Sequence, residues 1–171
     1  MASRKPLDPL QQWYKLRNLF VGHYVDQDIN KALELAATCQ HPDAVWLAGI
    51  FAGRPVTTEE EVVAVLLEQG EDARALCFAG LFLFDSALLR RSAALGYGFA
   101  HAGLAFDSSG EERFLHASRA ALAGDQEGVC WLAYCYQEGE GCERNLEKSR
   151  ALYLQEAMQG NRGAHRCHVV F

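Results

Sequence analysis

Three cysteines lie within one fourteen-residue segment, VCWLAYCYQEGEGC, at residues 129–142. Thiolates bind metal ions and act as nucleophiles, so Cys130, Cys135 and Cys142 could form a metal site or a redox pair. On one helix Cys130 and Cys135 would project about 140° apart, which is too far to meet at one ion. Cys142 lies beyond two glycines, and the chain contains no C-x-x-C motif. We therefore expect these cysteines to pack as small hydrophobic residues.

The segment HRCH at residues 165–168 is a second candidate for metal binding. His165 and His168 are three residues apart, a spacing that places two side chains on one face of a helix. A metal site would need a second pair of ligands, and none is convincingly spaced, so we expect no metal and no cofactor. A metal- or thiol-dependent role for Cys142, Cys167, His165 and His168 is kept as an alternative.

The glycines of the GEG segment, residues 139–141, do not read as a phosphate-binding loop. Such a loop follows a strand and opens a helix. Here the glycines follow an expected helix, and the carboxylate of Glu140 would repel a phosphate. No local signature of a catalytic dyad or triad is present either, so we expect no enzymatic activity.

The composition is that of a folded protein with a net negative charge. Half of the 171 residues are hydrophobic, 22% are charged and the net charge is −6. A net acidic chain disfavours nucleic acid as the partner. The apolar run from Ala75 to Phe84 is shorter than the roughly 20 residues that cross a bilayer, and the N-terminus lacks the apolar core of a secretory signal. We expect no membrane partner, reduced thiols and a cytoplasmic location, with a nuclear one as the alternative.

A repeated sequence pattern predicts the helices that would position these residues. Four segments align, each with an alanine at one position and Leu or Phe before it: AVWLAGIF at 44–51, ALCFAGLF at 75–82, HAGLAFDS at 101–108 and VCWLAYCY at 129–136. A small residue lets two helix axes approach closely, while large neighbours fill the space around it. The pattern therefore predicts alternating helices, named A and B, that pack in pairs.

The boundaries of these helices follow from capping residues and closing glycines. The A helices are expected at about 28–39, 58–69, 86–95, 110–123 and 145–159, and the B helices at about 9–22, 42–52, 72–84, 97–106 and 126–137, with a further start at 162. The expected N-caps and capping boxes are Asp28, Thr57 with Glu60, Ser86, Ser109 with Glu112, and Asn145, and Pro9, which follows Asp8, is expected in the first turn of the first helix.

Within this pattern, the stretch AYCYQEGEGCERNLEKSRALYLQEAMQGN at 133–161 resembles a Sel1-like repeat (SLR), a relative of the tetratricopeptide repeat. The positions that match the family's motif are Ala133, Tyr136, Gly139, Gly141, Cys142, Asn145, Lys148, Ser149, Ala157, Gly160 and Asn161. A second stretch, GHYVDQDINKALELA at 22–36, matches at Gly22, Val25, Asp28, Lys31 and Ala32, with Tyr24 in place of the second glycine. The repeats between the two stretches are degenerate.

The resemblance implies an all-α fold, a right-handed α-α superhelix of about five antiparallel helix pairs. We expect one solenoid domain over residues 1–171 whose last pair is incomplete. The resemblance also implies a protein–protein interaction module, an adaptor or scaffold that binds a protein or peptide on its concave face. The alternative is a regulatory repeat domain of a larger catalytic assembly. Self-association could occur through the open C-terminal repeat.

Five residues are the candidates for contact with a partner. Arg91 and Arg119 each lie five residues before a closing glycine, so they occupy the same position in successive repeats and would form a column on the A helices. Arg90, Arg113 and His116 are expected nearby on outward faces. Arginine suits bidentate contacts with carboxylates or phosphates, so this set is the predicted partner-binding site.

Overall fold

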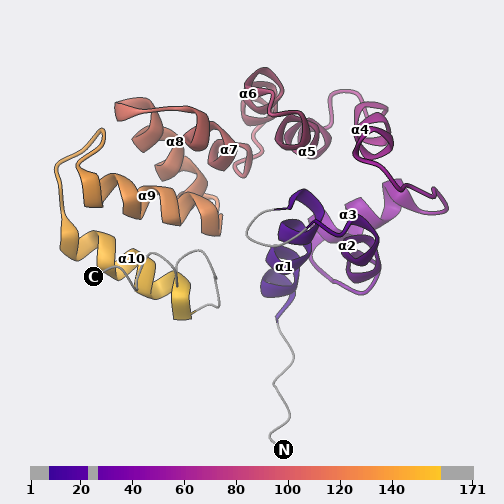
Figure 1. Cartoon of the computed structure of the whole chain (residues 1–171), viewed down its shortest axis with the longest axis horizontal. Helices are drawn as coiled ribbons and strands as arrows, with labels where there is room; N and C mark the ends of the chain where they lie inside the picture. Colours follow the sequence, from indigo (N-terminus) through magenta and orange to yellow (C-terminus); the bar gives the residue numbers. More distant parts are fainter. Residues whose placement is uncertain (1–7, 23–26, 159–171) are drawn as a thin grey trace, which may run out of the picture. The chain divides into compact units, whose positions relative to one another are not determined.

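The computed structural model describes residues 8–22 and 27–158, which form ten α-helices and no strand (Figure 1). These residues contain no helix that is long and apolar enough to cross a bilayer. The chain divides into two compact units, Met1–Glu68 and Gln69–Phe171. Each unit is described by itself, and the expectation of one continuous domain stays a prediction.

The first unit contains α1 (Pro9–Val21), α2 (Ile29–Ala36), α3 (Pro42–Phe51) and α4 (Glu59–Leu67). Helix α2 packs against both α1 and α3. Large side chains fill the core: Trp13, Leu16 and Phe20 of α1 and Leu47 and Phe51 of α3 are all buried. The Phe20 and Phe51 rings meet edge to face with centres 5.9 Å apart, a favoured aromatic geometry.

The second unit contains α5 (Ala73–Leu83), α6 (Ser86–Ala94), α7 (Ala100–Asp107), α8 (Gly110–Leu122), α9 (Gln126–Glu138) and α10 (Leu146–Met158). Each helix packs against the next one along the chain, as α8, α9 and α10 show in Figure 1. The predicted small residues Ala79, Ala105 and Ala133 are fully buried in α5, α7 and α9, which confirms their packing role. Ala48, at the same position in α3, is only partly buried.

The predicted helix starts are confirmed where a side chain caps the first turn. The carboxylates of Asp8 and Asp28 accept hydrogen bonds from the backbone N–H groups of Gln11 and Lys31, at 2.8 and 3.0 Å. The side-chain oxygen of Asn145 accepts from the N–H of Lys148 at 2.9 Å. These contacts involve residues three apart, so the sequence alone is enough to place them.

Three of the predicted caps are wrong in detail. The capping box joins Thr58 and Glu61, one residue later than expected. Asp85, not Ser86, caps α6, because the Asp85 carboxylate accepts hydrogen bonds from the backbone N–H groups of Ala87 and Leu88. Ser109 forms no capping bond. There the carboxylate of Glu140, from a distant loop, accepts from the Gly110 N–H at 2.8 Å and takes the place of a local cap.

The cysteines of the described residues behave as packing groups. Cys39, Cys77 and Cys135 are buried, with exposed fractions of 5%, 2% and 0%, while Cys130 and Cys142 are partly buried. Burial, with smaller contributions from the nearby Glu140 and Cys142, raises the pKa of the Cys135 thiol to about 11. The part of the chain that the structure describes has no group of three or more His, Cys, Asp or Glu able to hold a metal. Residues 165–168 lie outside it.

Candidate partner-binding site on α6, α7 and α8

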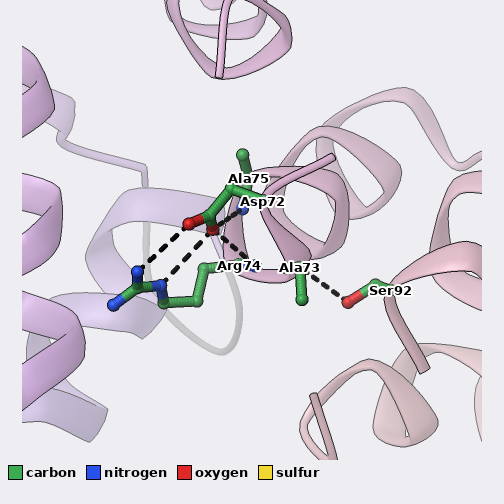
Figure 2. A network of polar contacts seen from close by, with 5 residues as sticks. All are labelled: Asp72, Ala73, Arg74, Ala75 and Ser92. Carbon is green, nitrogen blue, oxygen red and sulfur yellow. Dashed lines mark hydrogen bonds and ion pairs between the residues drawn. The ribbon is translucent and has the colours of Figure 1, made fainter. Parts of the chain in front are cut away.

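The contact between α5 and α6 sets the position of the first two candidate arginines. Asp72 caps α5 and also binds the guanidinium of Arg74, at 3.1 Å from Nη2 and 3.4 Å from Nε (Figure 2). From α6, the buried Ser92 hydroxyl donates a hydrogen bond to the carbonyl oxygen of Ala73 at 2.6 Å. This bond ties the first turn of α5 to the last turn of α6, beside Arg90 and Arg91.

Arg91 and Arg119 occupy equivalent positions, as the sequence spacing predicts. The carbonyl oxygens of both arginines accept the N–H of the residue that ends the helix, Leu95 in α6 and Ala123 in α8. Their surroundings differ, however. Arg91 forms an ion pair with Glu71, and both side chains are largely exposed. An exposed pair of this kind contributes at most about 1 kcal/mol to stability, so a ligand could compete for Arg91.

Arg113 is not on an outward face, and that part of the prediction is wrong. Its Nη1 lies 2.7 Å from the Glu140 carboxylate, and its Nε donates to the Ala105 carbonyl oxygen at 3.0 Å. Its guanidinium also lies over the Trp131 ring, 5.1 Å from the ring centre. Only 17% of the side chain is exposed. Arg113 therefore holds α7, α8 and the loop after α9 together, and its guanidinium group is already used in contacts within the protein.

The loop after α9 is held to α8 by Glu140, a residue that the sequence analysis considered only as a group repelling phosphate. Its two carboxylate oxygens bind Arg113 and the Gly110 N–H. Gly141 packs directly on the Gly110 backbone and leaves no space for a Cβ atom. Gly139 has φ of 73°, in the left-handed region that glycine adopts most easily. The GEG segment is thus a joint between repeats.

His116 is also misplaced by the outward-face prediction, because only 9% of the residue is exposed. It lies against His101, a residue of α7 that the sequence analysis did not single out, and their Nδ1 atoms are 2.9 Å apart. The ring centres are 5.0 Å apart with an angle of 27° between the ring planes. The two Nδ1 atoms are at hydrogen-bonding distance, and a bond forms between them when one ring carries its proton at Nδ1 and the other does not.

Burial and nearby cations both lower the pKa values of the two histidines. Burial lowers the pKa of His116; Glu112 opposes the shift, and Arg119 and Arg90 add to it. The pKa of His101 is lowered by burial, then by His116 and Arg119. The Glu112 carboxylate lies 3.7 Å from Nε2 of His116. Three helices thus contribute to one cluster: Arg90 from α6, His101 from α7, and Glu112, His116 and Arg119 from α8.

Two of the five predicted residues are available to a partner without the loss of an ion pair. Arg90 and Arg119 are exposed, and neither forms an ion pair with any other described residue. By contrast, Arg91 and Arg113 each contact a carboxylate. We call Arg90, Arg119 and the His101–His116 pair the basic cluster. Whether it contacts a partner stays a prediction.

Comparison with solved structures identifies the architecture. The chain is similar to a Sel1 repeat protein from Oxalobacter formigenes, with a TM-score of 0.61 and 18% sequence identity over 94% of this chain and 75% of that chain. The chain has a Sel1-like repeat fold. It is also similar to c5321, a protective antigen of uropathogenic Escherichia coli that displays an SLR fold, with a TM-score of 0.52 and 20% identity.

The second match covers 91% of this chain but 39% of the E. coli protein, so this chain spans well under half of that relative. No family model matches the chain, and no curated protein matches its sequence. Both results agree with a chain that keeps the full SLR pattern in few of its repeats. The predicted all-α fold of sequential helix pairs is confirmed by the ten helices of the described residues and by these matches.

Proposed function

We propose that this protein is an interaction module, an adaptor or scaffold, that binds a protein or peptide partner at the basic cluster. The Sel1-like repeat fold, which is typical of protein-interaction modules, supports the proposal at the level of the fold. The observation that carries it to a site is the pair of exposed arginines, Arg90 and Arg119, with no carboxylate partner among the described residues. Arginine that is free of its own chain's carboxylates can bind those of a ligand.

The proposal assigns the chain no catalysis and no cofactor. The raised pKa of the Cys135 thiol supports this part, because a catalytic cysteine has a lowered pKa. We place the protein in a reducing compartment, cytoplasmic or nuclear, where the free thiols of Cys39, Cys135 and Cys142 would persist.

The test is affinity capture from a lysate with three versions of the full chain. One is the wild type, one carries Arg90→Glu and Arg119→Glu, and one carries Lys15→Glu and Lys31→Glu. The last reverses two exposed cations of the first unit and is the matched control. We expect partners that bind the wild type and the lysine variant and are lost from the arginine variant. Equal capture by all three versions would exclude the basic cluster as the binding site.

A further inference from the structure

The geometry of the His101–His116 pair limits how many protons it can hold. A hydrogen bond between the two Nδ1 atoms, which lie 2.9 Å apart, requires that one of them is protonated and the other is not, so the bonded pair shares a single proton between these atoms. A further proton can be added at an outer Nε2 without breaking this bond, and it would make the bond charge-assisted. If both rings were charged, both Nδ1 atoms would carry protons and the contact would be lost. The intact pair can therefore carry one positive charge, and its two rings titrate together.

The charged groups that face the pair determine how readily it takes up that proton. Arg90 on α6 and Arg119 on α8 oppose it, while Glu112 on α8 favours it. With neutral histidines, the two arginines and Glu112 leave one positive charge in excess. An anion placed between the arginines would match this excess and would reduce their repulsion of a charged pair. Anion binding and proton uptake should then assist each other.

We propose that the basic cluster binds a carboxylate of an acidic peptide and that the His101–His116 pair takes up a proton when it does. This inference rests on the proposed function and names the class of partner. Arg90 and Arg119 supply the hydrogen-bond donors, since guanidinium groups bind carboxylates in a bidentate manner. The pair supplies the second positive charge. The affinity therefore rises as the pH falls, because the protonated pair binds an anion more tightly than the neutral one.

A short acidic peptide fits the charges better than an extended polyanion does. The chain has a net charge of −6, which repels a long nucleic acid over most of its surface. The basic cluster is local, and a single carboxylate matches its one excess charge. A peptide needs only this local attraction, with its remaining contacts supplied by neighbouring helix surfaces.

The test uses the full chain and a fluorescein-labelled hexaglutamate peptide, with hexaglutamine as the uncharged control. Binding is followed by fluorescence anisotropy at about pH 7.5 and about pH 5.5, on either side of the usual histidine pKa. We expect binding several-fold tighter at the lower pH. The Arg90→Gln, Arg119→Gln variant should lose about tenfold or more in affinity at both pH values. Lys15→Gln, Lys31→Gln should bind as the wild type does.

Proton uptake can be measured without changing the histidines. Calorimetry of the wild type with hexaglutamate near pH 6, in two buffers with different ionisation enthalpies, reports the protons taken up on binding. We expect net uptake by the wild type. A His101→Gln variant with unchanged circular dichroism should take up fewer protons and show a weaker pH dependence, while the arginines still bind the peptide.

The outcomes separate this inference from the proposed function. If binding depends on the arginines but takes up no proton, the inference is overturned and the site stands. Binding of hexaglutamate that is equally strong in the arginine variant would overturn both. If the cluster binds a phosphoserine peptide or an oligothymidylate but not hexaglutamate, or binds none of these probes, the acidic-peptide assignment is overturned.

Discussion

Cys135 shows how a residue with reactive chemistry becomes a packing residue. The side chain is fully buried in α9, and burial is the main cause that raises its pKa to about 11. Cys142 donates from its Sγ to the Cys135 carbonyl oxygen at 3.4 Å, and burial raises its pKa as well. A segment rich in cysteine is therefore poor in thiolate, which is the reactive form.

We predict that Cys135 resists alkylation in the folded protein. Near pH 8, a thiol with this pKa is ionised to only about one part in a thousand, and burial also blocks access to it. The measurement is iodoacetamide labelling followed by peptide mapping, with and without urea. Cys135 should be labelled only in urea. Rapid labelling of Cys135 in the native protein would contradict the assigned packing role.

The arginines mark the limit of what sequence reasoning can predict at this scale. Spacing alone places Arg91 and Arg119 at equivalent positions, because helix geometry is local and regular. It does not predict which arginine meets a carboxylate, since Glu71 and Glu140 come from loops many residues away. The inward position of His116 was missed for the same reason: its partner His101 lies on another helix.

At the scale of helices, the predicted order and number of the described elements match the structure, and most boundaries fall within a few residues of their predicted positions. These features depend on capping and apolar periodicity, both of which are short-range. The failed cap at Ser109 depends on Glu140, a long-range contact that no local rule contains. The residues that hold one repeat to the next are thus the hardest to predict from a degenerate sequence.

Two glycines with different surroundings give an element-scale prediction. Gly49 lies exposed within α3, and an added Cβ would meet no atom within 4 Å. Gly49→Ala should therefore stabilise the protein by about 0.5–1 kcal/mol, because alanine favours helix more than glycine does. At Gly98, before α7, an added Cβ would collide with the Cβ of Ala123 at the end of α8. Gly98→Ala should cost about 1–3 kcal/mol.

A double-mutant cycle isolates the collision. Ala123→Gly removes the Cβ atom that Gly98→Ala would meet, so the double variant should recover most of the loss. Urea unfolding followed by circular dichroism gives the free energy of unfolding of each variant. Strictly additive losses in the double variant would show that the close approach of the α7 and α8 ends is not the cause.

For the whole molecule, two well-preserved stretches were enough to indicate the fold. The SLR motif at residues 133–161 and its partner at 22–36 predict helix pairs on either side of the degenerate repeats, and the structural matches extend over more than nine-tenths of the chain. The fold tolerates this degeneracy because each pair needs only a small residue and an apolar face to pack on its neighbours. The motif alone gave no indication that the chain divides into two units.

The described histidines predict how stability depends on pH. His41 in the first unit and His101 and His116 in the second all have a lowered pKa, mainly because of burial. As the pH falls below about 6.5, the unfolded chain binds protons that the folded chain resists, so the free energy of unfolding falls. The stabilisation that comes from neutral histidines is fully present above the pKa that these residues have in the unfolded chain. It is lost as the pH falls through their lower pKa values in the folded chain.

Urea unfolding of the wild type at about pH 7.5, 6.5 and 5.5 measures this dependence. The midpoint should fall most steeply between the two lower values, and His101→Gln should make that fall smaller. The carboxylates of Glu61 and Asp72, whose pKa values are lowered by hydrogen bonds, lose their contribution only near or below their ordinary pKa of about 4, so they do not overlap this window. A midpoint that is constant or rises on acidification to pH 5.5 would show that the histidines are not held neutral by the fold.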